Sequence, residues 1–451
     1  MRARNVSLDR PIEETTLSAR HLAIRRLVAL LALVGLLAVL GAAGGPVAAA
    51  DRSTPTVVGR PSDVTFFGRG WGHGVGMSQH GARGRALAGQ NAATILAHYY
   101  AGTTLGSKDP GSQVRVLLLN GFAASSAAPL TIIGRGGGWS IDNVGSFPAD
   151  AKLTLWPATA GSTTWTLRVV SSTGAQLRSQ AVSRGLTVRP GSMAVLQLVS
   201  KRSTWDTYRG TLRVRLSTTA VVVNDLGLDT YLRGVVPIEM PASWPTEALR
   251  AQAIAARSYA AYRLHPTTGT FDVYDDTRSQ VYRGVEAEAA GSDAAIAATS
   301  GIVLKSGSAI ANAMFHSTGG GATEHNENVF VSATGAIVAS PVSYLRGSPD
   351  RRPDGSSYDA GAPLATWQTA AYTMAELSAV FVRDARTNSG TLARLDLSRR
   401  GVSGRLISVT LVGSAGSKTV SGDVFRSVFN AWRPAGEPEL RSTLFDTRPI
   451  P

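Results

Sequence analysis

The sequence contains no cysteine in its 451 residues. This absence excludes a disulfide framework, a zinc site with thiolate ligands and a cysteine nucleophile. Charged residues are also few, at 17%, whereas 43% of the chain is hydrophobic, which is the composition of a globular protein rather than of a disordered one. A chain of this length can bury a large core, and we expect it to hold more than one structural unit.

Long hydrophobic runs are equally scarce, and a single one is long enough to matter for a membrane. It extends from Leu27 to about Gly45, follows a cluster of arginines and precedes Ala48-Ala49-Ala50, the small-x-small pattern that signal peptidase reads. We therefore expect residues 1–50 to be a cleaved signal peptide and the protein to be secreted or associated with the cell wall. The alternative is an uncleaved membrane anchor, since about 18 apolar residues just span a bilayer.

The net charge is strongly positive, with 45 basic and 31 acidic residues and a formal charge of +14. Residues 51–451 retain 39 basic and 28 acidic residues, a surplus of 11. Such a balance favours polyanionic partners: nucleic acid, anionic lipid or wall polymer. The sequence has no nucleic-acid-binding motif, so we expect no nucleic acid and favour an anionic wall polymer.

The segments that follow residue 50 differ in pattern. Residues 51–63 form a polar linker, and residues 64–105 hold a glycine-rich loop followed by a helical stretch from about 78 to 100. Residues 106–205 contain short apolar runs such as VRVLLL and WTLRVV between Gly, Ser and Asp clusters, which predicts a β-rich lobe. Residues 206–451 form the remaining core, which begins with a hairpin at 208–223. The predicted fold class is α+β, β-rich and multi-lobed.

The strongest predicted helix is the Ala-rich run EALRAQAIAARSYAAYRL. Ser243 or Trp244 is expected to cap it, with Pro245 in its first turn, where a missing N–H costs nothing, and Glu247 complementing the helix dipole. The runs AELSAVFV and GDVFRSVFNA predict two further helices towards the C-terminus.

Glu239 is the first candidate for chemistry, in the run YLRGVVPIEMPASWP. Pro237 and Pro241 fix the backbone on either side of this carboxylate. A partly desolvated glutamate held in this way would have a raised pKa and could act as a general acid. The structural interpretation is an ordinary glutamate at the start of a helix.

The second candidate is the run GHGVGMSQ at 72–79. Glycines around His73 let the backbone approach a ligand, and the imidazole can donate or accept a proton. The run lacks GK[ST] and a βαβ context, so it is not a nucleotide-binding loop. The structural interpretation is a tight turn that holds a hydrogen-bonded histidine.

The third candidate is the run FHSTGGG at 315–321, in which a strand would present His316 and Ser317 to a cleft. His316 and His325 are nine residues apart, which is weak support for a metal, and we expect no metal ion and no cofactor. A serine hydrolase is not indicated, because no G-x-S-x-G motif occurs.

Four long runs resemble the SpoIID/LytB family, which is named after stage II sporulation protein D. They are YLRGVVPIEMPASWPTEALRAQAIAARSYA at 231–260, DTRSQVYRG at 276–284, residues 298–330, and residues 66–105 with the GHGVGMSQ block. The family order usually places that block last, after a segment like SGDVFRSVFNAW, which here stands at 421–432. The resemblance therefore implies a circularly permuted arrangement, in which residues 64–105 fold back beside the C-terminal part. In that arrangement His73 and His316 border one cleft with Glu239. Helix 421–430 then packs near the start of the block.

The resemblance implies a peptidoglycan lytic transglycosylase with Glu239 as its single acid/base, acting on the bond between MurNAc and GlcNAc. The residues expected to line the cleft are His73, Ser78, Gln79, Arg257, Gln280, His316 and Ser317. The zinc site of some family members uses cysteine and is not expected here. The same resemblance also implies a competing function, that of a non-catalytic modifier that stimulates a wall amidase. A third possibility is a module that only binds the wall.

Overall fold

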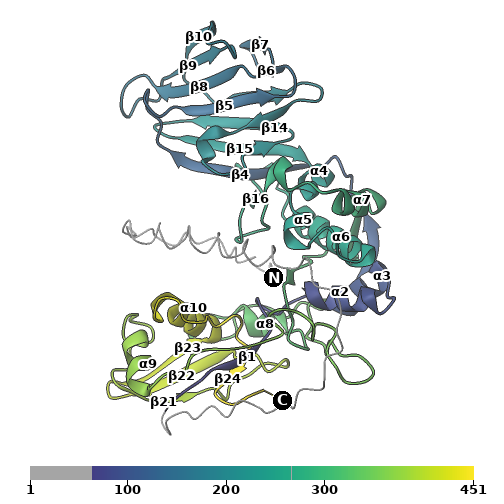
Figure 1. The fold of residues 1–451 in the computed structure, drawn as a ribbon, viewed down its shortest axis with the longest axis vertical. Helices are drawn as coiled ribbons and strands as arrows, with labels where there is room; N and C mark the ends of the chain where they lie inside the picture. Colours follow the sequence, from purple (N-terminus) through teal and green to yellow (C-terminus); the bar gives the residue numbers. More distant parts are fainter. Residues whose placement is uncertain (1–62, 266, 451) are drawn as a thin grey trace, which may run out of the picture. The chain divides into compact units, whose positions relative to one another are not determined.

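Clusters of antiparallel strands alternate with groups of helices along the chain, which confirms the predicted α+β, β-rich fold (Figure 1). The computed structural model describes residues 63–265 and 267–450, so the predicted signal peptide and nearly all of the predicted linker lie outside the described residues. Within the described ranges, no helix combines the length and the apolar character needed to cross a membrane.

The β-rich lobe consists of two sheets that share one core (Figure 1). The strand order of the first sheet is β10-β9-β8-β5-β12-β13, with bounds Gln176–Val182, Trp165–Val170, Lys152–Pro157, Leu130–Arg135, Val195–Gln197 and Thr207–Tyr208. The second sheet has the order β16-β4-β15-β14-β11-β6-β7, with bounds Val273–Tyr274, Gln113–Phe122, Ala220–Gly227, Thr211–Leu216, Leu186–Pro190, Trp139–Ile141 and Gly145–Phe147. Side chains alternate along the strands: in β9, Trp165, Leu167 and Val169 are buried, whereas Arg168 is exposed.

The boundary of the lobe differs from the prediction. The hairpin β14–β15 was expected to begin the core segment after residue 205, yet β15 pairs with β4 and β14 pairs with β11. These long-range pairings bury Leu212, Val214 and Val222 in the lobe's core. The lobe therefore extends to Gly227, because apolar strands are placed by the sheet that buries them and not by their position in the sequence.

A group of helices follows the lobe. Its members are α4 (Leu228–Arg233), α5 (Val236–Glu239), α6 (Thr246–Tyr262) and α7 (Ala290–Ala298). The small alanine side chains of α6 let several elements pack closely around it, and 13 of its 17 residues are buried. The expected cap at Ser243 or Trp244 is wrong: Pro245 is the N-cap residue, with no side-chain hydrogen bond, because its extended backbone places it just outside the helix.

The glycine-rich block packs against this helical group. The predicted helix at 78–100 is interrupted by the turn Ala88–Asn91, giving α2 (Gln79–Leu87) and α3 (Ala92–Tyr99), and both contact α6. Glu247 of α6 accepts a hydrogen bond of 2.7 Å from the N–H of Ala92. Two small sheets complete this region, one with the order β18-β17-β3 (Ala309–Ile310, Ile302–Ser306, Thr104–Ser107) and one formed by β19 and β2 (Phe315–His316, Met77–Ser78).

The C-terminal part contains two three-stranded sheets and two helices. Their elements are β20 (Thr366–Gln368), β1 (Phe67–Arg69) and β24 (Phe445–Asp446); β21 (Leu392–Asp396), β22 (Ser408–Gly413) and β23 (Gly416–Ser421); and α9 (Met374–Phe381) and α10 (Gly422–Trp432). Phe66 lies in the core of this part, with its ring centroid 5.9 Å from that of Phe425 and 5.6 Å from that of Phe429 in α10. The expectation that the start of the glycine block packs near helix 421–430 is therefore confirmed. Short helical turns η1 (Val199–Lys201), η2 (Gly284–Ala287) and α8 (Asn326–Val329) connect the larger elements.

Candidate active site

Glu239 is the last residue of the short helix α5, which has Pro237 in its first turn. Met240 then turns the backbone into an extended conformation and is fully buried, so it fixes the position of the preceding carboxyl group. The proline limits the backbone on one side and the buried methionine limits it on the other. The Glu239 side chain remains partly exposed, as a group that must contact a ligand requires.

Two donors hold the Glu239 carboxyl group, and neither is a cation. The Nε2 of Gln79 donates to Oε2 at 3.0 Å, and the backbone N–H of Val281 donates to Oε1 at 3.4 Å. Burial raises the pKa of Glu239, whereas the hydrogen bonds from Gln79 and Val281 lower it, and the net shift is upward. Among the described residues, no lysine or arginine forms an ion pair with this carboxylate. A carboxyl group whose pKa is raised in this way is suited to act as a general acid.

A short parallel strand pairing with β19 positions the glycine-rich block beside Glu239. Met77 and Ser78 in β2 lie beside Phe315 and His316 in β19. Ser78 caps α2 and its Oγ accepts hydrogen bonds of 3.0 Å from the N–H groups of both Gly81 and Gly319, so Gln79 begins the helix at a fixed position.

The approach to β19 explains one glycine of the block. Gly76 has a φ of 70°, and a Cβ there would lie 2.0 Å from the carbonyl oxygen of Met314. A side chain at this position would push the two backbones apart.

His73 and His316 lie side by side, with their ring centroids 5.4 Å apart. The Nδ1 of His73 accepts a hydrogen bond of 3.0 Å from the N–H of Val75, and the Nδ1 of His316 lies 3.3 Å from the Val75 carbonyl oxygen. Burial lowers the pKa of His73 to about 4, with a further contribution from Arg405, and burial lowers the pKa of His316 well below its usual value. Both imidazoles are therefore neutral at pH 7, which suits a positioning role rather than the donation of a proton.

Residues 217–305 match the family described as "Stage II sporulation protein". A 127-residue stretch is 40% identical to an uncharacterized protein of Brachyspira hyodysenteriae (strain ATCC 49526 / WA1), covering 27% of this chain and 34% of that protein. The amidase enhancer of Bacillus subtilis (strain 168) is 41% identical over 108 residues, or 24% of this chain and 14% of the enhancer. Stage II sporulation protein D of the same organism is 34% identical over 128 residues, or 25% of this chain and 37% of that protein.

Residues 217–305 and the stretches shared with these relatives make this part of the chain similar to the SpoIID/LytB family. The chain spans no more than 37% of the length of these three relatives. The SpoIID match includes Glu239, α6, the whole loop that follows it and α7, but it ends before His316 and does not include the block at 64–105.

Two residues of the SpoIID-like runs have structural roles that the sequence does not reveal. Arg257 was predicted to bind substrate, but its side chain is fully buried and forms an ion pair of 2.6 Å with Asp229. Its remaining N–H groups lie 3.1 Å from the carbonyl oxygen of Ile302 and 3.3 Å from that of Ile296. The prediction is corrected, because a fully buried guanidinium that is bound to these partners is not exposed to a ligand.

Gln280 was also predicted to bind substrate and is only 1% exposed. Its Oε1 accepts a hydrogen bond of 3.2 Å from the hydroxyl of Tyr231, and its Nε2 donates at 3.4 Å to the carbonyl oxygen of Ala256. These bonds hold the loop whose next residue, Val281, donates to Glu239. Gln280 is therefore better described as a positioning residue.

The other predicted residues lie at the junction of the glycine block and the 315–321 loop. Ser78 is fully buried and serves as a helix cap, so its assignment to substrate binding is corrected for the same reason as that of Gln280. Ser317 is partly exposed, and its Oγ lies 3.2 Å from that of Thr318. Neither histidine of the pair forms a hydrogen bond with Glu239 in the described structure, and their roles stay predictions.

Three aromatic residues near Glu239 were missed by the sequence analysis. Burial raises the pKa of Tyr231 and of Tyr259, and the negative charge of Glu239 raises both further. This electrostatic effect indicates that both rings lie in the surroundings of Glu239. Trp244 is partly exposed five residues after Glu239, and its ring centroid lies 4.8 Å from that of His80. An aromatic side chain within the same motif as a catalytic candidate was the available signal.

No group of three or more histidine, aspartate or glutamate side chains capable of holding a metal ion occurs in the described ranges. His325 accepts a hydrogen bond of 2.8 Å from the N–H of Gly347, which occupies its Nδ1. The expectation that the protein uses no metal stays a prediction.

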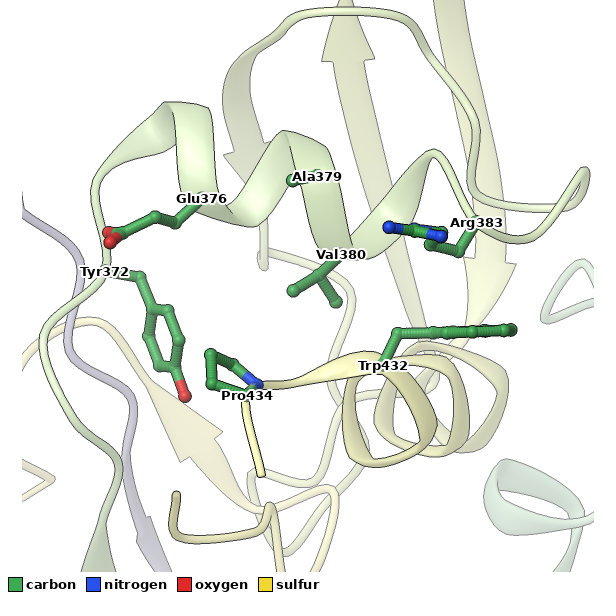
Figure 2. A pocket seen from close by; sticks show the side chains of 7 residues that line it. All are labelled: Tyr372, Glu376, Ala379, Val380, Arg383, Trp432 and Pro434. Atoms are coloured by element: carbon green, nitrogen blue, oxygen red, sulfur yellow. The ribbon is translucent and has the colours of Figure 1, made fainter. Parts of the chain in front are cut away.

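A separate pocket of about 310 Å³ lies between α9 and the end of α10 (Figure 2). Its lining residues are Tyr372, Glu376, Ala379, Val380, Arg383, Trp432 and Pro434. Its carboxylate, Glu376, is part of the capping box of α9, where Oε2 accepts hydrogen bonds from the N–H and the hydroxyl of Thr373. Because that carboxylate serves the helix, the pocket is a poorer candidate for acid/base chemistry than the surroundings of Glu239.

Proposed function

We propose that this protein is an exported, peptidoglycan-acting protein that cleaves the MurNAc–GlcNAc bond of glycan strands as a lytic transglycosylase. The observation that carries the proposal is the Glu239 carboxyl group, which is partly desolvated, raised in pKa and held by two uncharged donors. The similarity of residues 217–305 to the SpoIID/LytB family supports action on the cell wall. Export rests on residues 1–50 of the sequence, which lie outside the described residues.

In the proposed reaction, Glu239 serves first as acid and then as base. Its proton moves to the glycosidic oxygen while the bond from that oxygen to C1 of MurNAc breaks. The 6-hydroxyl oxygen of the same sugar then bonds to C1, and its proton returns to the Glu239 carboxylate. No water is consumed, and one carboxyl group is sufficient because it is regenerated at the end of each cycle. This chemistry does not need the paired carboxylates of most glycosidases.

The surrounding residues would keep the carboxyl group in place through both steps. Gln79 and Val281 each bind one oxygen, so the carboxyl group keeps its orientation while it acts first as acid and then as base. Trp244 is partly exposed near the start of α6, where His80 and Arg83 contact its ring, and its exposed part would be available to pack against a sugar ring.

A second function is favoured by one observation, the 41% identity to a protein named amidase enhancer. In that case the protein would stimulate a cell-wall amidase as a partner and cleave nothing itself. A purely wall-binding role is the third possibility, and it has the basic charge as its support.

The test is incubation of the purified protein with peptidoglycan and, separately, with glycan strands stripped of stem peptides. We expect release of anhydro-muropeptides, and we expect Glu239→Gln to lower the rate by at least roughly 100-fold, the usual scale for a general acid/base. Glu247→Gln is the matched control, because this nearby carboxylate binds a backbone N–H and Arg250, and it should keep nearly full activity.

Two outcomes would contradict the proposal. Unchanged turnover in Glu239→Gln would remove the catalytic assignment. Wild-type protein that releases product only after an amidase is added, with no anhydro ends, would favour the modifier function instead.

A further inference from the structure

The positive charge of this protein is concentrated in the β-rich lobe. Residues 113–227 contain 12 lysines and arginines but only 4 aspartates and no glutamate. Their net charge of +8 is more than half of the chain's net charge of +14. Residues 228–450, which hold Glu239 and the C-terminal part, contain 21 basic and 21 acidic residues and are neutral overall. Residues 63–112, which include the glycine-rich block, add four basic and two acidic residues, so the lobe holds most of the surplus positive charge of the described residues.

Half of the lobe's cations are occupied by carboxylates. Arg135, Arg189 and Arg213 form ion pairs with aspartates of the lobe itself. The other paired cations, Arg115, Lys201 and Arg209, bind Asp272, Asp275 and Glu288 of the following segment. These pairs neutralise charge or fasten the lobe to the helical group, so they are not available to a partner.

The remaining six cations are exposed and form no ion pair with any residue of the described ranges. They are Lys152, Arg168, Arg178, Arg184, Arg202 and Arg215. An exposed cation without a carboxylate keeps its full field, and several on one surface attract a polyanion more strongly than the same number scattered over a molecule.

Three of the six lie on the consecutive strands β8, β9 and β10 of the first sheet (Figure 1). Thr154 of β8 is directly opposite Arg168 of β9, and Lys152 is two residues before Thr154. Lys152 and Arg168 are thus diagonal neighbours on the same outward face, roughly 7–8 Å apart. Arg178 lies on the adjacent strand β10, whose first four residues are all exposed. Arg178 is directly opposite the buried Val169, so its side chain leaves β10 on the other face of the sheet from Lys152 and Arg168. Successive strands are about 4.8 Å apart, and β10 is the last strand of the sheet, so the three charges surround this edge from both faces.

We propose that this edge of the β-rich lobe binds a linear polyanion of the cell envelope, one that carries repeated phosphate or carboxylate groups. A linear polymer can contact the successive strands at once, whereas a small anion would use one cation. Nucleic acid is the less suitable partner, because Leu177, Met193 and Val199 are the large apolar side chains that residues 113–227 expose, and none is an aromatic platform for bases. The proposal does not depend on Glu239 being catalytic.

The test compares two charge-matched triple variants of the full chain. The lobe variant is Lys152→Gln, Arg168→Gln, Arg178→Gln. The control variant is Arg394→Gln, Arg399→Gln, Lys418→Gln, which removes one lysine and two arginines that are likewise exposed and outside any ion pair of the described ranges. Polyglutamate and long-chain inorganic polyphosphate serve as carboxylate and phosphate probes, with duplex DNA as the third ligand. Binding is measured between about 50 and 200 mM salt, where electrostatic contacts respond strongly.

We expect the lobe variant to bind at least one of the two polymers about tenfold or more weakly at low salt, and the control variant to bind it nearly as wild type does. The slope of log affinity against log salt should fall by up to about three in the lobe variant, roughly one for each contact removed. The preferred polymer identifies phosphate or carboxylate as the recognised group. Both variants should keep the wild-type melting temperature, because the substituted side chains are exposed.

Equal losses in the two variants would overturn the proposal, since only net charge would then matter. So would the absence of binding to either polymer, or tighter binding of duplex DNA than of both. A catalytically inactive protein that still shows the expected difference would leave this proposal standing while the transglycosylase assignment fails.

Discussion

Replacement of Gln79 by leucine tests how Glu239 is held. The Gln79 amide donates a 3.0 Å hydrogen bond to Glu239 Oε2 and thereby favours the ionised carboxylate. Leucine is similar in size, suits the first position of α2 and leaves the cap at Ser78 untouched. The change therefore removes one donor from the carboxyl group while keeping the local fold.

The direction of the effect follows from which form the donor stabilises. Loss of the hydrogen bond raises the pKa of Glu239 further, because burial then acts against a single remaining donor, the N–H of Val281. A hydrogen bond to a charged group contributes about 1.5–3 kcal/mol, and about 1.4 kcal/mol corresponds to a tenfold change in a protonation equilibrium. Because the carboxyl group is partly exposed, water replaces part of the lost bond, and we take the lower end of that range.

The assay is the release of anhydro-muropeptides at low substrate concentration between pH 4 and 9. In Gln79→Leu, the alkaline limb of the kcat/KM profile should move upward by about one pH unit, since the acid must be protonated when the bond to C1 breaks. Gln90→Leu is the matched control: Gln90 donates to the Tyr358 hydroxyl instead, so its alkaline limb should stay in place. A profile that stays in place in Gln79→Leu, or that moves to lower pH, would refute this account of the site.

Two further predictions concern stability. Arg257→Ala should lower the free energy of unfolding by about 3 kcal/mol in urea titrations, because it leaves Asp229 without its cation and with only the Ser300 hydroxyl as a donor. Replacement of a substrate-binding arginine would instead raise KM with little loss of stability. Burial holds the pKa of His73 and of His98 at about 4, below the 6.5 of an unfolded histidine. The contribution of these two neutral histidines to the free energy of unfolding is therefore fully present above about pH 6.5 and is lost as the pH drops towards 4. His98→Gln should make that fall shallower in melting experiments, and an unchanged slope would show that His98 does not stay neutral in the folded protein.

The sequence predicted the elements that depend on local pattern and missed those that depend on distant partners. The Ala-rich helix and both C-terminal helices are present because their apolar spacing and flanking residues act within a few turns. The β14–β15 hairpin was assigned to the wrong unit because its place is decided by pairing with β4, about 100 residues earlier. The 78–100 helix was expected to be continuous, whereas Asn91 caps a new helix after a glycine turn.

The same distinction applies to the residues that were predicted for the site. The resemblance implied that Gln79 lines the cleft of Glu239, and the structure joins these two residues by a hydrogen bond across 160 residues of sequence. Arg257 and Gln280 belong to the same runs but serve the scaffold. A motif retains both kinds of residue for physical reasons, because a buried polar group needs its partners as strictly as a reactive group needs its position. Only the burial and the hydrogen-bond partners seen in the structure distinguish a scaffold residue of the motif from a reactive one.

The glycine-rich block links the surroundings of Glu239 to the C-terminal part by contacts at its two ends. Phe66 packs against Phe425 and Phe429 of α10, while Gln79 reaches Glu239 only 13 residues later in the sequence. A block with both attachments is part of the candidate site rather than a separate binding lobe, which is what the permuted order requires. Because the anchoring ring of Phe66 is fully buried, the position of Gln79 depends on the C-terminal core as well as on α6. Loss of packing at Phe66 would therefore weaken the hold on the Glu239 carboxyl group from a distance, through the strand and loop between them.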